Sequence, residues 1–485
     1  MYALLNRRFG FAENGTTLRR DTVAGATTFV VMSYIIFVNP TILSFLGVEG
    51  LENQGLPFDG VLASTCLIAG LMTILMGIYT NRAYAMAPGL GINAIVAFSL
   101  VANVGLTFPQ AMGIIVMEGL AVTALVITGL RQRIMVAIPL ELKKAIAIGI
   151  GLFIAFIGFY NSGLVAKAPA PGVPVELGDF TTWPVFVTIV GLVLTISLRA
   201  VGFPGDLLVG IVATTALATI VNRATDYTAF TTPGVARLPD HVVEHPDFSL
   251  LGNFDFGSFA EIGVLSTLVW VFSLFLSDFF DTMGTLVGVG KQAGYLDARG
   301  ELPEIRRPLL VDSLGAVGGG VVSSSSATTY IESAAGIGVG GRTGWVSVVA
   351  GALFFPFLFL APIIGIVPAQ ATAPALIVVG WLMMSTLTES QHQAEPGREG
   401  ALKLAGIDFG DLAVGLSAAL TIMVIPFTWS ITNGIGFGFI TYVVIRLAQR
   451  RWREVHPLLY VIAAAFTLYF LVPLLQEKVG FLGAA

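Results

Sequence analysis

The sequence predicts an all-α membrane protein that crosses the bilayer many times. Of 485 residues, 55% are hydrophobic and only 11% are charged, whereas a soluble domain carries about 25% charged residues. The chain also contains 56 glycines, which are more frequent in tightly packed transmembrane helices than in soluble ones. Apolar segments recur along the whole chain, and roughly 20 such residues form a helix that crosses a hydrocarbon core of about 30 Å.

About fourteen of these segments are expected to span the membrane, seven on each side of a polar stretch at 223–258. The first seven lie at 22–46, 60–79, 88–104, 109–130, 145–164, 183–200 and 204–222. The second seven lie at 260–290, 307–322, 326–339, 344–368, 371–388, 411–430 and 432–449. A further apolar segment at 455–476 is a fifteenth span, a helix lying against the bundle, or a sign that one span has been divided in two.

The distribution of positive charge predicts a multi-pass protein of the cell (inner) membrane with a cytoplasmic N-terminus. The cytoplasmic side then holds Arg7, Arg8, Arg19, Arg20 and the cluster Arg446, Arg450, Arg451 and Arg453. The opposite side receives mainly Arg223 and Arg237. The single cysteine, Cys66, excludes an intrachain disulfide and a thiolate metal cluster.

Two spans are short and occupy corresponding positions in the two halves, the third at 88–104 and the tenth at 326–339. Residues that suit irregular backbone precede both, in NRAYAMAPGLG and GGGVVSSSSATT. Paired interrupted segments are the best sequence indication of a transporter binding site, and an odd number of spans in each repeat inverts its topology. The alternative is two ordinary half-buried helices with flexible entries.

Two carboxylates lie within the eighth apolar segment, in SLFLSDFFDTMGTLVGVG. Asp278 and Asp281 are three residues apart and are expected to share a helix face, close to Thr282. A charged residue at the centre of a membrane helix costs roughly 2.5–3.5 kcal/mol, so such residues are functional candidates by default. The alternative is that one aspartate only caps or cross-links a helix.

A third carboxylate, Glu332, lies early in the tenth span, in a helix expected to begin near Thr328. The free N–H groups and the dipole of a buried helix N-terminus stabilise a nearby carboxylate. Asn93 on the opposite half-helix offers a paired donor and acceptor. Glu118 and Asp312 are interpreted as structural residues that bond to backbone or to a neighbouring helix.

Carboxylates at fixed positions accept hydrogen bonds from N–H groups of a ligand. A planar N–H-bearing heterocycle, a cationic amine and a metal ion all fit this chemistry, although no histidine joins the acids as a metal ligand. No Lys or Arg lies deep within a span, which disfavours an anionic substrate. The aromatic side chains that could pack on a flat ring are Phe275, Phe279, Tyr330 and Phe98.

The motifs TTYIESAAGIGVGGRTG, SDFFDTMGTLVG, MAPGLGINA and SYIIFVNPTIL closely resemble those of the AzgA-like purine permeases, a branch of the nucleobase–cation symporter superfamily. The resemblance extends from about Phe9 to the HPLLYV segment near residue 456. It implies two inverted seven-span repeats, with a short strand before the half-helix in spans 3 and 10. It also implies a core domain at 22–130 and 260–369 and a gate domain at 138–222 and 370–476.

Members of this family import adenine, guanine or hypoxanthine with protons, generally as homodimers, and the core moves against the gate in an elevator-like manner. By resemblance, Glu332 and Asp278 are the substrate-binding acids and Asn93 is the asparagine of the third span. Ile331, beside Glu332, and Phe98 complete the expected substrate contacts. Asp281, Asp278, Glu332 and Thr282 are the expected proton-coupling or site-shaping residues.

The chain departs from the family pattern at two places that touch the expected pocket. Ser323 to Ser326 replace a GTST-like string, and Ala94, Ile95 and Val96 follow Asn93 where an aromatic residue is often found. These departures leave the choice among purines open. Independently of them, a uracil or xanthine carrier of the same superfamily is the nearest alternative, and an anion transporter of the same architecture is a more distant one. An enzyme is not expected, nor a metal, an organic cofactor or a nucleic-acid partner.

Overall fold

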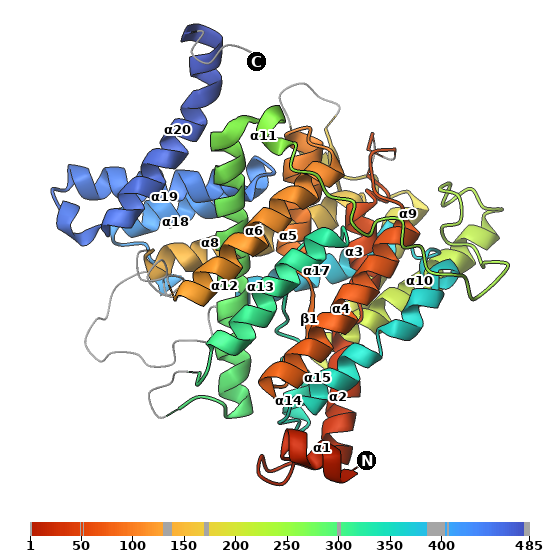
Figure 1. Cartoon of the computed structure of the whole chain (residues 1–485). Helices are drawn as coiled ribbons and strands as arrows, with labels where there is room; N and C mark the ends of the chain where they lie inside the picture. Colours follow the sequence, from red (N-terminus) through yellow and green to blue (C-terminus); the bar gives the residue numbers. More distant parts are fainter. Residues whose placement is uncertain are drawn as a thin grey trace.

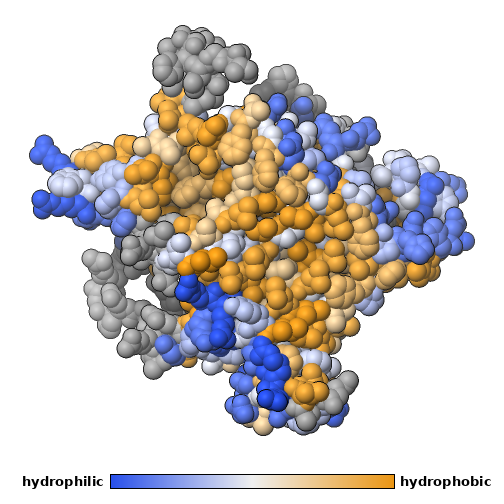
Figure 2. Space-filling view, viewed as in Figure 1, coloured by the Kyte–Doolittle hydropathy of each residue, from blue (hydrophilic) through white to orange (hydrophobic). Residues whose placement is uncertain are grey.

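A computed structural model describes most of the chain. The described residues are 2–48, 50–51, 53–129, 138–168, 174–297, 302–385, 403–404 and 407–479. Nearly all of the ordered elements are helices (Figure 1), so the all-α prediction is confirmed. Figure 2 shows hydrophobic side chains covering the centre of one face, with hydrophilic ones gathered toward its lower, left and right ends.

The helices of the first half follow the predicted apolar segments. They are α1 (Tyr2–Phe9), α2 (Leu18–Met32), α3 (Ile35–Leu43), α4 (Phe58–Thr80), α5 (Leu90–Ala94), the π-helix η1 (Ile95–Asn103), α6 (Phe108–Thr128), α8 (Leu140–Asn161), α9 (Trp183–Ala200) and α10 (Asp206–Ala224). A short hairpin of β2 (Val165–Lys167) and β3 (Val175–Leu177) lies between α8 and α9.

The second half begins with the short α11 (Ser258–Glu261). It continues with α12 (Gly263–Ala293), α13 (Arg306–Val321), α14 (Ser333–Gly338), α15 (Trp345–Ala352), η2 (Phe355–Phe359), α16 (Ala361–Ile364), α17 (Ala369–Ser385), α18 (Leu412–Phe427), α19 (Ile431–Ala448), η3 (Trp452–Glu454) and α20 (Pro457–Val479). Strands β5 (Lys403–Leu404) and β6 (Ile407–Asp408) precede α18. The extra apolar segment at 455–476 thus forms the helix α20, which projects away from the bundle at the top of Figure 1.

Eight helices of the described residues are long and apolar enough to cross a membrane. They are Leu18–Leu43, Phe58–Thr80, Phe108–Thr128, Leu140–Asn161, Trp183–Ala200, Asp206–Ala224, Gly263–Ala293 and Ile431–Ala448. Other apolar helices are shorter, among them α17 and α18, so the count of fourteen spans stays a prediction.

The two interrupted segments meet at their strands, as predicted. Strand β1 (Met86–Pro88) pairs antiparallel with β4 (Ala327–Thr329), and Ala87 lies opposite Thr328. Two further backbone bonds extend the ladder, from Tyr330 N to Ala85 O at 2.9 Å and from Gly89 N to Ser326 O at 2.8 Å. Each strand thereby satisfies backbone groups that the other would leave unpaired inside a membrane. The tenth half-helix begins at Ser333, so the expected helix start near Thr328 is wrong, because strand pairing takes those residues.

Close approach of helix backbones depends on glycine at several crossings. A Cβ atom on Gly77 of α4 would lie 2.3 Å from the carbonyl oxygen of Gly344, just before α15. One on Gly351 of α15 would lie 2.7 Å from the carbonyl oxygen of Gly70. Small residues at both faces of a crossing are typical of membrane helices, where packing rather than hydrophobic burial drives association.

The helix contacts fall into two sets. Helices α2, α4, α6, α13, α14 and α15 pack mainly on one another, whereas α8, α9, α10, α17, α18 and α19 form a second set. Helix α12 packs on α6 and α14 of the first set and also touches α8 and α19. These sets contain the segments assigned to core and gate, but their behaviour as two moving domains remains a prediction.

Candidate functional site

The three predicted acids surround the paired strands β1 and β4, which we call the strand crossing. Asp278 and Asp281 come from α12, and Glu332 occupies the position just before α14. The Asp278 side chain is fully buried, and its Oδ1 accepts a hydrogen bond of 3.3 Å from the hydroxyl of Ser326. The serine string that departs from the family pattern therefore supplies a donor to one of the acids.

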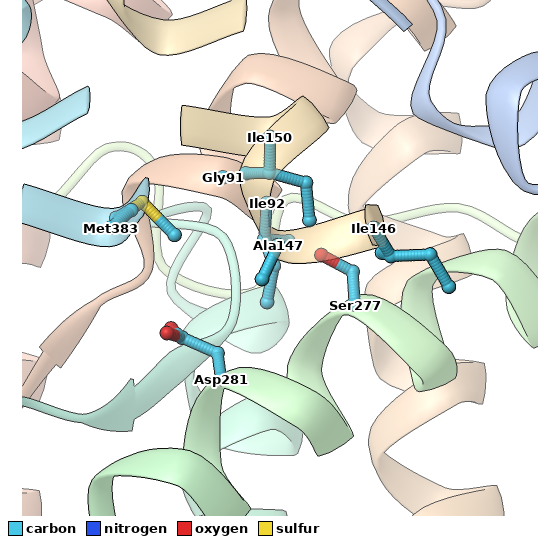
Figure 3. A pocket seen from close by; sticks show the side chains of 8 residues that line it. All are labelled: Gly91, Ile92, Ile146, Ala147, Ile150, Ser277, Asp281 and Met383. Carbon is cyan, nitrogen blue, oxygen red and sulfur yellow. The ribbon is translucent and has the colours of Figure 1, made fainter. Parts of the chain in front are cut away.

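Asp281 faces a pocket that lies between α5 and α12 on one side and α8 and α17 of the second set on the other (Figure 3). The free space in the pocket is about 20 Å³, enough for about one water molecule and far below the roughly 300–1,000 Å³ of small-molecule sites. Its lining residues come from α5, α8, α12 and α17 and are Gly91, Ile92, Ile146, Ala147, Ile150, Ser277, Asp281 and Met383.

The two aspartates do not point into this pocket together. Asp281 shares its lining with Ser277, four residues earlier, whereas Asp278 contacts Ser326. Successive helix residues turn by about 100°, so positions four apart align better than positions three apart. Of the three predicted acids only Asp281, which was expected to couple protons or shape the site, is among the residues that line the pocket. The roles of all three stay predictions.

Gly91 allows the half-helix α5 to approach α8 at this pocket. A Cβ atom on Gly91 would lie 2.8 Å from Cγ2 of Ile150 and 4.0 Å from the hydroxyl oxygen of Ser277. A larger residue would therefore push α5 away from α8 and fill space beside Asp281.

Glu332 is held by a residue that the sequence reasoning missed. The Tyr34 hydroxyl donates a hydrogen bond of 2.7 Å to Glu332 Oε1. Tyr34 lies in the turn between α2 and α3 and is 1% exposed. A tyrosine within an apolar span is itself a signal, because a buried phenol needs a partner for its hydroxyl.

A second buried acid, Asp312 of α13, ties together the elements that carry the site. Its Oδ2 accepts a hydrogen bond of 2.8 Å from Thr282 of α12. Its Oδ1 accepts two bonds of 3.0 Å from the backbone N–H and hydroxyl of Thr329 in β4. Thr282 thus contacts Asp312, and the pair fixes α12 and β4 relative to each other. The expected structural role of Asp312 fits these contacts.

The remaining predicted contacts lie in different surroundings. Asn93 on α5 is fully buried, and in the described part of the chain neither its Oδ1 nor its Nδ2 has a hydrogen-bond partner. An unpaired buried amide is costly, so this side chain is available to a ligand. Ile331 is half-buried beside Glu332. The Phe98 ring packs against Trp429 of the α18–α19 turn, with ring centroids 5.4 Å apart and planes tilted by 59°, and Phe98 is not among the residues that line the pocket.

Comparison with known proteins identifies relatives over almost the whole chain. A family model described as the permease family, Xan_ur_permease, matches residues 19–407. The adenine permease AdeP of Escherichia coli strain K12 is 36% identical over 465 residues, covering 96% of this chain and 95% of that protein. The guanine/hypoxanthine permease GhxP of Escherichia coli O157:H7 is 35% identical over 468 residues, with 96% of each chain covered.

Among solved structures, the transmembrane domain of a cyanobacterial bicarbonate transporter, BicA, has a similar fold. The TM-score is 0.57 at 15% identity, with 87% of this chain and 97% of that chain covered. This likeness concerns the fold alone, and it supports the predicted architecture of two inverted repeats.

Proposed function

We propose, from the premise that this chain belongs to the permease family, that it imports purine nucleobases together with protons. The chain is a multi-span membrane transporter and not an enzyme, as its permease relatives show. Relatives named for adenine and for guanine and hypoxanthine are equally similar to it, so adenine, guanine and hypoxanthine are the proposed substrates.

The observation that carries the proposal is that Asp278, Asp281 and Glu332 lie around the paired strands β1 and β4, while α5, which follows β1, carries the unpartnered amide of Asn93. Purines are flat and present both N–H donors and ring-nitrogen acceptors. Carboxylates match the donors, and a carboxamide matches one donor and one acceptor. Glu332 and Asp278 are the proposed purine contacts, and Asp281 faces the pocket from the same helix.

Closely spaced carboxylates cannot all be ionised at low cost in an apolar surrounding. One of the three is therefore proposed to hold the coupled proton, so that proton uptake and purine binding depend on each other. Asp278, Asp281 and Glu332 are all candidates for this proton, whereas Asp312 accepts its three hydrogen bonds from Thr282 and Thr329 and links α12 to β4.

The position of the pocket supports an elevator-like movement. Its walls come from α5 and α12 on one side and from α8 and α17 on the other. A shift of the first set of helices against the second would carry the strand crossing and its acids past the wall formed by α8 and α17. A homodimer that meets through the second set, with the N-terminus in the cytoplasm of the cell, completes the proposal.

The decisive experiment is uptake into proteoliposomes with an imposed pH gradient. Radiolabelled adenine, guanine, hypoxanthine, xanthine and uracil are compared at two external pH values, with and without a protonophore. We expect at least one of the first three to accumulate against its gradient when the lumen is alkaline, and the protonophore to abolish accumulation. Accumulation of uracil or xanthine alone, or accumulation that the protonophore leaves intact, would overturn the proposal.

An anion transporter is disfavoured by the same residues. The fold is shared with a protein named as a bicarbonate transporter, but three acids around the crossing would repel an anion. Adding bicarbonate as a competitor in the uptake assay checks this point, and we expect no inhibition.

A further inference from the structure

Trp429, in the turn between α18 and α19, is surrounded by aromatic side chains. Four ring centroids lie between 5.3 and 5.8 Å from its own, those of Phe98, Phe153, Phe156 and Tyr160. Separations of this size, with tilted or edge-to-face planes, are those of favourable aromatic pairs. We call these five residues the Trp429 cluster.

The Trp429 cluster joins the half-helix of the first repeat to the second set of helices. Phe98 lies on η1, which continues the half-helix that carries Asn93 and packs on α6 of the first set. The other rings belong to α8 and to the α18–α19 turn. A hydrogen bond joins the same segments, since the Ser99 hydroxyl donates to the backbone carbonyl oxygen of Trp429 at 2.7 Å.

The backbone at Trp429 is left-handed, with a φ of +51°. Phe45, whose ring lies 5.7 Å from that of Phe98, has a φ of +52°. Bulky residues rarely adopt this conformation, and glycine adopts it without strain. Strained residues persist where the surrounding structure holds them, often at functional sites. The requirements of the turn therefore do not explain a tryptophan at this position, whereas the contacts of its ring do.

The Trp429 cluster lies next to the pocket along two of the helices that line it. On α8, Ile150 lines the pocket and Phe153 of the cluster follows three residues later, about 5 Å along the helix axis. On the half-helix that begins with α5, Ile92 lines the pocket and Phe98 follows six residues later. Because Trp429 contacts rings from both helices, it bridges them on this side of the pocket.

The same side of the pocket is the outer one in the proposed orientation. Helix α19 begins just after Trp429 and carries Arg446, a member of the predicted cytoplasmic cluster, near its other end. Phe98 and Phe153 are buried, whereas Trp429 is half-buried. The Trp429 cluster therefore lies between the pocket and the outer surface.

We infer that Trp429 is a gating residue that closes the outer end of the purine route, with Phe98 and Ser99 as its partners on the half-helix. A movement of the first set of helices against the second separates these partners from Trp429 and opens the pocket to the outside. Gating of one part of a transporter against the other around a central site is the general form of alternating access. The inference deepens the proposed function and takes its substrate and orientation from it.

The test measures access to the pocket from each side of the membrane. Ser277→Cys, in a Cys66→Ala background, places a thiol among the pocket-lining residues. A charged, membrane-impermeant methanethiosulfonate is applied to right-side-out and to inside-out vesicles, and the rate of labelling is measured. Loss of the ring contacts shifts the population toward the outward-open state, so Trp429→Ala should raise the external labelling rate about tenfold or more. The rate from the cytoplasmic side should not rise.

Ser99→Ala provides a milder variant that leaves every ring in place. It removes the 2.7 Å bond to Trp429, so the external rate should rise a few-fold. Trp345→Ala is the matched control, because the Trp345 ring packs edge-on against Phe9 at 5.6 Å, near the N-terminus and outside the Trp429 cluster. The external rate should not change in this variant.

The outcomes separate the inference from the proposed function. External rates that stay at the wild-type value in the folded variants, or that rise equally from both sides or equally in Trp345→Ala, would overturn the gating role. If Trp429→Ala does not fold, the rise expected of Ser99→Ala decides the matter. A wild type that transports no purine overturns the proposed function, whereas the labelling rates still test the gate because they require no substrate.

Discussion

The two half-helices that meet at the strand crossing share one backbone plan but differ in chemistry. In the first half, β1 leads into α5 and the π-helix η1, and the polar group near the crossing is the neutral amide of Asn93. In the second half, β4 leads into the six-residue α14, and the polar group is the carboxylate of Glu332. The acids of α12 belong to the second half as well.

The proposed proton-coupled transport requires one group that binds a proton and other groups that bind the substrate at any pH, and the two halves differ in which of these they supply. The repeat supplies a pair of strands whose backbone groups satisfy each other. Under the proposed coupling, the acids of the second half bind the proton, and the first half contributes the neutral amide of Asn93 and the hydroxyl of Tyr34. We therefore expect pH dependence to follow the second half and pH-independent affinity to follow the first.

The largest expected effect belongs to Glu332→Gln. Loss of a charge-assisted hydrogen bond costs about 1.5–3 kcal/mol, and loss of a proton-binding group also removes coupling, so concentrative purine uptake should fall roughly 100-fold or more. Uptake in proteoliposomes with a pH gradient measures this. A variant that still accumulates purine with wild-type pH dependence would remove Glu332 from the mechanism.

Asn93→Leu should give the next largest effect and a different signature. The KM for purine is expected to rise about 30-fold, because two hydrogen bonds of the order of 1 kcal/mol each are lost. The pH profile should not move. Thermal stability should stay the same or increase, since the variant removes an unpartnered buried amide. A melting temperature well below that of the wild type would show that Asn93 is a structural residue. The first half would then lack the neutral substrate-binding group that distinguishes it from the second half.

Tyr34→Phe tests whether a neutral residue of the first half modulates an acid of the second. The variant keeps the ring and removes the 2.7 Å bond to Glu332, so uptake should fall only a few-fold. Because a donor to the charged form of Glu332 is lost, the midpoint of the pH profile should move upward. Uptake measured across a pH series provides both values. An unchanged midpoint would show that Tyr34 only orients Glu332.

The smallest effect on purine uptake is expected when Asp411 is replaced, because this acid of the second half lies outside the site. Although partial burial acts in the opposite direction, hydrogen bonds from Arg446 and from the backbone N–H groups of Val414 and Ala413 hold the pKa of Asp411 below its usual value. Asp411 therefore stabilises the fold above about pH 4, the ordinary value for an unfolded chain, and this contribution is lost as the pH falls through its lower folded pKa.

Asp411→Asn should leave purine uptake within about twofold of the wild type and reduce the melting temperature by a few degrees at neutral pH. The difference in melting temperature from the wild type should shrink below about pH 4. A loss of uptake as large as that of Glu332→Gln would mean that any acid of the second half matters, wherever it lies.

The sequence by itself determined the class of protein and identified the carboxylates that lie within its apolar segments. Long apolar segments predict membrane helices because hydrophobicity is a local property, and Asp278, Asp281 and Glu332 are conspicuous there because charge is expensive in an apolar span. The strands at Met86–Pro88 and Ala327–Thr329 were expected from the family resemblance, whereas the interrupted segments by themselves predicted only irregular backbone.

Only the tertiary structure decided which groups meet. The Tyr34–Glu332 bond and the Thr282–Asp312 bond join residues whose separation along the chain carries no periodic signal. The different directions of Asp278 and Asp281 depend on where β4 and α8 pack around α12. Such contacts are set by the packing of helices remote in sequence, which local hydropathy and spacing do not encode.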